Sequence, residues 1–163
     1  MNKFLALIIV MVCFINCEAQ PDPTSFSDAA LNGVFVDSKG DAHSLQSVLE
    51  THQGKTILID VWASWCRDCI VSLPDLNAVQ NEYADVVFVF LSIDKTEKSW
   101  KKGIRKYHIK GEHYFMSDGW DSAFSEFVDL DWVPRYMVID KEGHIALFRA
   151  VKITDPKIKE HLN

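Results

Sequence analysis

The sequence predicts an α/β fold built on a mixed β-sheet, and three observations support this. Two β-branched, apolar runs, 56–62 and 86–93, have the composition of strands that are buried on both faces. Apolar residues recur at helical spacing between them, over about 67–82. Strand, helix and strand in this order form a right-handed βαβ unit with parallel strands. Two later runs, 136–139 and 145–151, flank a glycine turn and predict an antiparallel hairpin.

Residues 1–19 are predicted to be a secretory signal peptide rather than part of the fold. A basic start precedes the apolar run 4–15, which is too short for a comfortable membrane span. The preferred cleavage point follows Ala19. The alternative is a lipoprotein signal with Cys17 as the lipidated first residue, although Asn16 stands where such signals usually have a small residue. Either route exports the protein.

The rest of the chain is predicted to be one domain, residues 31–163, after a polar and proline-broken spacer over residues 20–30. Hydrophobic residues make up 48% of the sequence, which is enough for a buried core. The net charge of -6 gives no electrostatic case for binding nucleic acid or an anionic membrane surface.

The remaining elements are predicted from local patterns. Pro74 lies inside the helical pattern and is expected to kink it. The lysines of a second helix are interpreted as a solvated face. The further predicted elements are an N-terminal β-hairpin of 34–36 and 42–45, helices over 45–51, 96–108, 120–128 and 156–162, and a strand over 113–116.

Cys66 and Cys69 determine the chemistry that the sequence predicts. They lie three residues apart, where the strand 56–62 ends and a helix begins. Free N–H groups and the dipole at a helix N-terminus lower the pKa of a thiol, and the thiolate is the nucleophile in disulfide exchange. We therefore expect Cys66 to be the exposed attacking thiol. Cys69, one turn inside the helix, is expected to be the more buried resolving thiol.

A static disulfide and half of a zinc site are the alternatives for this pair. Zinc usually takes two such pairs, or one pair and two closely spaced histidines, and the sequence offers neither. Without the leader, Cys66 and Cys69 are the only cysteines, which is too few for a disulfide-stapled scaffold. The preferred interpretation is a redox-active disulfide that needs no other cofactor and no metal.

Charged residues around the pair are expected to tune it. Asp60 lies within the apolar strand, where burial raises the pKa of a carboxyl group, so it is a candidate proton acceptor and donor for Cys69. The alternative is an acid at a strand edge that caps a nearby loop. Arg67 favours the thiolate form and Asp68 disfavours it, so their effects on the redox potential oppose each other.

These residues together resemble the thioredoxin superfamily, over about residues 34–162. The matching positions are Asp60 at the buried acid, Cys66 and Cys69 at the redox pair, Pro74 at the helix-kinking proline and Val133-Pro134 at the cis-proline step. The leader, the N-terminal hairpin and the long interval before Pro134 are most similar to the TlpA-like branch of periplasmic or membrane-tethered thiol–disulfide oxidoreductases. The resemblance implies a three-layer α/β/α sandwich with a mixed central sheet.

The resemblance also implies a function, which is dithiol–disulfide exchange on exported client proteins, with reduction as the preferred direction. Val133 and Pro134 would bind an extended stretch of the client by strand addition, beside Trp65, which shields Cys66. Another thiol protein would supply the electrons. Nucleic acid is not an expected partner, and a membrane is expected only if Cys17 is lipidated.

Two departures from the family leave alternatives open. Most of the branch has proline where Asp68 stands, and Phe90 replaces a lysine of thioredoxin, so Asp60 lacks a counter-charge and its pKa is expected to rise further. A disulfide oxidase or isomerase on the same scaffold is one alternative. A copper-binding chaperone is the other, but it needs a histidine before the cis-proline, and residues 129–132 have none.

Overall fold

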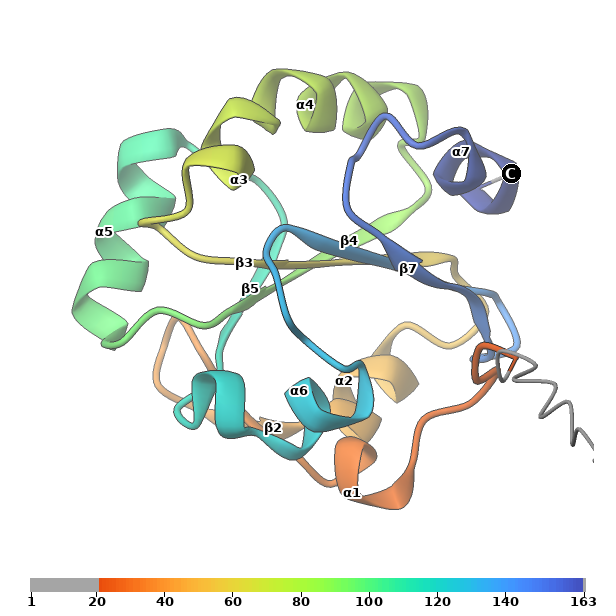
Figure 1. The fold of residues 1–163 in the computed structure, drawn as a ribbon, viewed down its shortest axis with the longest axis horizontal. Helices are drawn as coiled ribbons and strands as arrows, with labels where there is room; N and C mark the ends of the chain where they lie inside the picture. The colour runs from red at the N-terminus through yellow and green to blue at the C-terminus, as the bar shows by residue number, and fades with distance from the viewer. Residues whose placement is uncertain (1–20, 163) are drawn as a thin grey trace, which may run out of the picture.

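The computed structural model describes residues 21–162 (Figure 1). The predicted signal peptide, its cleavage after Ala19 and the alternative lipidation of Cys17 lie outside the described residues. Among the residues described, no helix is both long enough and apolar enough to cross a membrane.

Seven strands form one mixed sheet in the described part of the chain, in the order β2-β1-β5-β4-β3-β6-β7. Strands β3, β4 and β5 are parallel, whereas β6 runs antiparallel to β3 and β1 runs antiparallel to β5. The predicted mixed sheet is therefore confirmed. The strands are β1 (Val34–Asp37), β2 (Ala42–Ser44), β3 (Ile57–Trp62), β4 (Val87–Ser92), β5 (Glu112–Phe115), β6 (Arg135–Ile139) and β7 (Ile145–Ala150).

Helices cover both faces of the sheet and complete the predicted three-layer sandwich. Figure 1 shows α3, α4 and α7 on one side of the strands and α1, α2 and α6 on the other. Helix α5 packs beside the α3 side, because its Gly103 lies against Ser64 in the loop that leads to α3, and its Trp100 stacks on Phe115 of β5. The helices are α1 (Asp28–Leu31), α2 (Leu45–Thr51), α3 (Arg67–Val71), α4 (Leu73–Glu82), α5 (Glu97–Tyr107), α6 (Ala123–Phe127) and α7 (Pro156–Leu162), with a 3-10 turn η1 (Gly119–Asp121).

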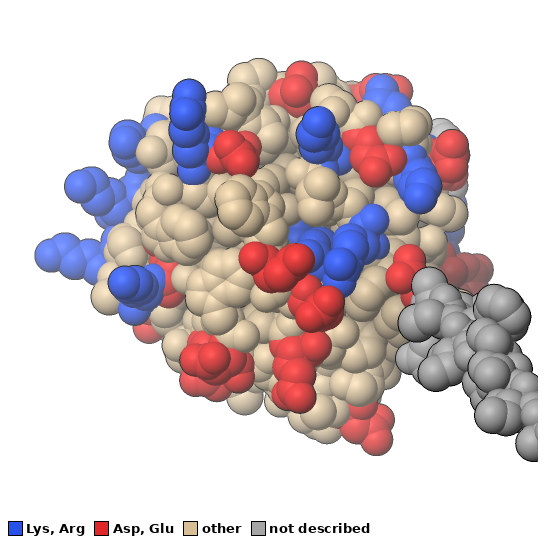
Figure 2. Space-filling view, in the orientation of Figure 1, with Lys and Arg blue, Asp and Glu red and all other residues tan. Residues whose placement is uncertain are grey.

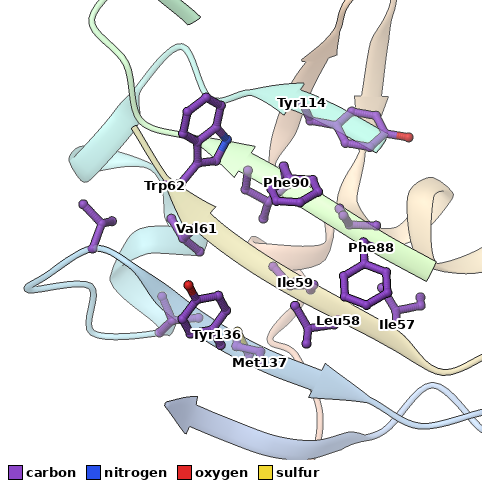
Figure 3. Close-up of a cluster of buried hydrophobic side chains, with 14 of the residues drawn as sticks. Ile57, Leu58, Ile59, Val61, Trp62, Phe88, Phe90, Tyr114, Tyr136 and Met137 are labelled. Carbon is purple, nitrogen blue, oxygen red and sulfur yellow. The ribbon is translucent and has the colours of Figure 1, made fainter. Parts of the chain in front are cut away.

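Strand β3 lies at the centre of the core. All six of its residues are buried, because β4 and β6 flank it and helices cover both of its faces. Figure 3 shows its apolar side chains packed with Phe88 and Phe90 of β4 and with Tyr136 and Met137 of β6. Burying one such side chain contributes roughly 1.5–3 kcal/mol, so this cluster supplies much of the stability that holds the site.

The helix after the cysteines is broken rather than kinked. Helix α3 ends at Val71 and α4 begins at Leu73, with Ser72 serving as cap for both. Pro74 lies in the first turn of α4, where a missing N–H removes no helical hydrogen bond. The single helix predicted over 67–82 is therefore two helices that meet at Ser72.

The predicted helix over 120–128 is likewise divided. The 3-10 turn η1 comes first, and α6 starts after Ser122, whose side chain accepts a hydrogen bond from Ser125 N–H at 3.0 Å. The other predicted helices and strands are confirmed with their ends within one residue.

Part of the predicted spacer, residues 20–30, is folded onto the domain. Thr24 O accepts a hydrogen bond from Ile145 N–H at 2.8 Å. Phe26 is buried, and its ring lies 6.2 Å from that of Phe124. One aromatic anchor fixes a segment that its polar composition assigned to a linker, so the folded part begins before residue 31.

Candidate active site

Cys66 and Cys69 form a disulfide at the end of β3, with their Cα atoms 5.4 Å apart. Cys66 is the N-cap of α3, and its Sγ accepts a hydrogen bond from the Cys69 N–H at 3.1 Å. A backbone donor aimed at this sulfur stabilises a thiolate once the disulfide is reduced. The predicted position of the pair, between strand and helix, is confirmed.

The difference in exposure between the two cysteines is smaller than expected. Cys66 is 6% exposed and Cys69 is 4% exposed, so the expectation of an exposed Cys66 is wrong. The disulfide to Cys69 and the Val133 carbonyl oxygen, which lies 3.4 Å from Cys66 Sγ, cover this sulfur. Cys66 nevertheless lines a surface pocket of about 390 Å³, which Cys69 does not line. Access to Cys66 therefore comes through the pocket.

Three tryptophans surround this pocket. Trp65 precedes Cys66, Trp132 precedes the Val133-Pro134 step, and Trp120 comes from η1. Their exposed fractions are 55%, 58% and 42%, so together they present an apolar surface around one pocket, and such a patch is typical of a binding site. Of the three, the sequence assigned only Trp65 to client binding. Trp120 and Trp132 are brought to the pocket by the fold.

The loop before β6 lies against the disulfide. The Val133-Pro134 peptide bond is cis, as the resemblance implied. The carbonyl oxygen of Val133 lies 3.4 Å from Cys66 Sγ. The sequence did not reveal that the buried Arg135 holds this loop. Its guanidinium donates to Val128 O at 2.9 Å and pairs with Asp131 at 2.5 Å.

Asp60 is buried in the middle of β3, next to Phe90 of β4 and Tyr136 of β6. The alternative of an acid at a strand edge is therefore wrong. Burial raises the pKa of Asp60 to about 8. Its Oδ1 has no hydrogen-bond partner among the described residues. A carboxyl group in this state can take up and release a proton near neutral pH.

Two hydroxyl groups connect β6, the strand next to Asp60, with Cys69. Ser72 Oγ donates to the Cys69 carbonyl oxygen at 2.8 Å. Tyr136 OH lies 3.1 Å from Ser72 Oγ. Because the single Ser72 proton is already donated, the Tyr136 hydroxyl is the donor in this contact. Burial raises the pKa of the Tyr136 hydroxyl, and the charge of Asp60 raises it further. The hydroxyl group therefore keeps its proton.

Asp94 holds the loop that carries Cys66, a role that the sequence did not predict. Its Oδ2 accepts from Ser64 N–H at 2.9 Å and its Oδ1 accepts from Ser64 Oγ at 2.6 Å. Ser92 Oγ also donates to Oδ2, at 2.9 Å. Asp94 is 2% exposed, and the position of an acid directly after a buried strand is the only sequence signal for it.

Arg67 and Asp68 line the pocket beside Cys66, as expected from their place in the first turn of α3. Neither side chain makes an ion pair with another described residue. Their opposing effects on the redox potential stay a prediction. Within residues 21–162, no cluster of three or more His, Cys, Asp or Glu side chains is placed to hold a metal ion.

Comparisons with known proteins agree on one family. Residues 54–145 match a family model described as thioredoxin-like. The chain is 25% identical over 131 residues to the thioredoxin-like protein YneN of Bacillus subtilis, and the aligned region covers 72% of this chain and 69% of that protein. It is 22% identical over 168 residues to the thiol–disulfide oxidoreductase ResA of Bacillus cereus, covering 98% of this chain and 91% of that one.

Solved structures give the same result. A solution structure assigned as a thiol–disulfide oxidoreductase from Bacteroides vulgatus matches with a TM-score of 0.69 and 34% sequence identity. The match covers 84% of this chain and 88% of the other.

Proposed function

The chain belongs to the thioredoxin-like family and is a thiol–disulfide oxidoreductase, and on this basis we propose that it reduces disulfides of exported proteins through Cys66 and Cys69. The observation that carries this proposal is the placement of Cys66. Its sulfur accepts a backbone N–H, lines a pocket between three tryptophans and touches the loop before β6. This arrangement suits an extended client chain at the reactive sulfur.

The reaction is two successive thiol–disulfide exchanges. The Cys66 thiolate attacks one sulfur of the client disulfide, which breaks the S–S bond and releases the other sulfur as a thiolate. The Cys69 thiol then loses its proton and attacks Cys66 Sγ, which expels the second client thiolate. The client gains two electrons, and the protein is left with the Cys66–Cys69 disulfide that the structure contains.

Asp60 is proposed to accept the proton of Cys69 in the second step. Its pKa of about 8 supports this role, because a base of that pKa exchanges protons near neutral pH. Arg67 and Asp68, at the pocket, are proposed to tune the redox potential in opposite senses. The disulfide carries the electrons, so the proposal includes no other cofactor.

Client binding is assigned to Val133, Pro134 and Trp65. The backbone of Val133 lies beside Cys66 Sγ, so a client strand that pairs with it would bring its own sulfur to Cys66. Export through the apolar leader, by cleavage or by lipidation of Cys17, would put the protein where disulfides form. A second thiol protein would then return it to the dithiol state.

Equilibration with a glutathione redox series tests the direction of transfer. We expect a reduction potential of about -270 mV, the value of a thiol reductant such as thioredoxin. A potential of about -120 mV, that of the oxidant DsbA, would instead show that the protein introduces disulfides. The Cys69→Ser variant is the control, because it cannot form the internal disulfide and can only form a mixed disulfide with glutathione through Cys66.

A further inference from the structure

The positive charge of this acidic protein is concentrated in one short segment. Residues 95–110 hold seven of the 17 Lys and Arg residues but only one of the 23 Asp and Glu residues. That acid, Glu97, is paired with Lys101 at 2.9 Å. Figure 2 shows blue side chains along the edge where Figure 1 places α5, while red side chains gather lower on the same face.

Most of these cations are exposed and lack an acidic partner among the described residues. The exposed ones are Lys95, Lys98, Lys102, Arg105, Lys106 and Lys110. Lys98, Lys102 and Lys106 follow one another at four-residue spacing, so their like charges lie on one face of α5 and repel each other. The sequence alone favoured a solvated face, but like charges at this spacing destabilise a helix, and acidic residues among them would relieve the repulsion without loss of solvation.

The position of α5 brings this charge to the active site. Gly103 has no side chain, and a Cβ added there would lie 2.5 Å from the Cβ of Ser64. Ser64 stands two residues before Cys66, so the helix backbone packs directly on the loop that carries the disulfide. Lys102 and Lys106, with Ser64, line a surface hollow of about 240 Å³ between the helix and this loop.

We propose that this face of α5, defined by Lys98, Lys102 and Lys106, is a docking surface for an acidic segment of the client protein. The inference rests on the proposed function and specifies its substrate class. An extended chain advances about 3.3–3.6 Å per residue, so Asp or Glu a few positions from the client cysteine would reach the hollow while the cysteine lies at Cys66. Attraction between these acids and the lysines of α5 would speed the encounter of client and protein, and repulsion would disfavour clients with basic residues at the same positions.

Three disulfide-bonded peptides with the same cysteine spacing test the proposal, with Glu, Gln or Lys at the flanking positions. The measurement is kcat/KM for their reduction by the wild-type protein at low and at physiological salt. We expect the Glu peptide to be reduced about tenfold faster than the Gln peptide, and the Lys peptide to be slowest. The preference is expected to shrink at higher salt, which screens exposed charges.

Two triple variants locate the effect. In Lys98→Gln/Lys102→Gln/Lys106→Gln, the rates for the Glu and Gln peptides are expected to become equal within about twofold. The control Lys39→Gln/Lys141→Gln/Lys157→Gln removes three exposed lysines elsewhere and is expected to keep the full preference. Loss of the preference in both variants alike would assign it to net charge and overturn the proposal.

The remaining outcomes separate the inference from the function on which it rests. Equal rates for all three peptides in the wild type would overturn the docking surface and leave disulfide reduction supported. No reduction of any peptide would contradict both. Equal peptide rates together with binding to phosphatidylglycerol vesicles, lost only in the α5 variant, would assign the surface to a membrane and also overturn the proposal.

Discussion

Asp60 places a carboxyl group in the middle of β3, a strand whose six residues are all buried. Its neighbours supply no positive charge, because Phe90 stands on one side and Tyr136 on the other. One strand beyond Phe90 lies His113, whose ring stacks on Phe90 with centroids 4.9 Å apart. Burial lowers the pKa of His113, which favours its neutral form. The folded protein therefore favours the protonated, neutral form of the Asp60 carboxyl group.

This environment predicts that stability falls as pH rises. An unfolded Asp has a pKa of 3.8, whereas folding raises that of Asp60 to about 8. Between these values the folded protein keeps a proton that the unfolded chain has lost, so the free energy of unfolding declines by up to about 1.4 kcal/mol per pH unit. Below pH 3.8 and above about pH 8 this contribution no longer changes.

Denaturant unfolding of the oxidised protein from pH 4 to pH 9 checks this prediction. The Asp60→Asn variant keeps the shape of the side chain but cannot ionise, so the decline should be absent from it. The stability of the wild type relative to the variant should therefore fall through this range. If the stabilities of the two proteins changed with pH in the same way, the claim that Asp60 is a buried acid without a counter-charge would be contradicted.

The loop between β3 and α3 is held from two sides. Asp94, two residues after β4, binds both the backbone N–H and the hydroxyl of Ser64. Helix α5 packs against the same residue at Gly103. Two elements that are distant in the sequence thus fix the segment that presents Cys66. The reactive sulfur is therefore positioned by the segment after β4 and by α5 as well as by its own helix.

Gly103→Ala tests this contact between elements. Alanine favours a helix over glycine by about 1 kcal/mol, but its Cβ would lie 2.5 Å from the Ser64 Cβ. Overpacking of this kind costs about 1–3 kcal/mol, so we expect a net loss of stability and a slower reaction at the displaced Cys66. Urea unfolding and disulfide-reduction rates measure the two effects.

A double-mutant cycle with Ser64→Gly supplies the control. Glycine at position 64 removes the Cβ that the new methyl group would meet, so Gly103→Ala should cost less in that background than in the wild type. An equal cost in both backgrounds would show that α5 does not constrain the loop.

Across the whole molecule, features encoded locally were predictable from the sequence. The β-branched run of β3, its acid and the cysteine pair are contiguous, so their placement follows from the order of residues 57–69. The pairing of Asp60 with Phe90 was implied by the resemblance, because two adjacent parallel strands alone do not fix their register. The cis bond before Pro134 was implied by resemblance alone, because most X-Pro bonds are trans.

Features that depend on packing between distant segments were not predictable. Trp120 reaches the pocket because η1 folds beside the disulfide. Arg135 holds the loop before β6 through the Val128 carbonyl group and the Asp131 carboxylate. The low exposure of Cys66 has the same origin. Phe26 turns part of an apparent spacer into folded structure because α6 offers it an aromatic surface.

The division of labour between the two cysteines is the central claim, and trapping the mixed disulfide tests it most directly. Reduced Cys69→Ser and Cys66→Ser variants are mixed with a disulfide peptide, quenched with acid and analysed by mass spectrometry. We predict that Cys69→Ser accumulates the peptide on Cys66, whereas Cys66→Ser forms little adduct because Cys69 does not line the pocket. Equally fast adduct formation on Cys69 would contradict the assignment.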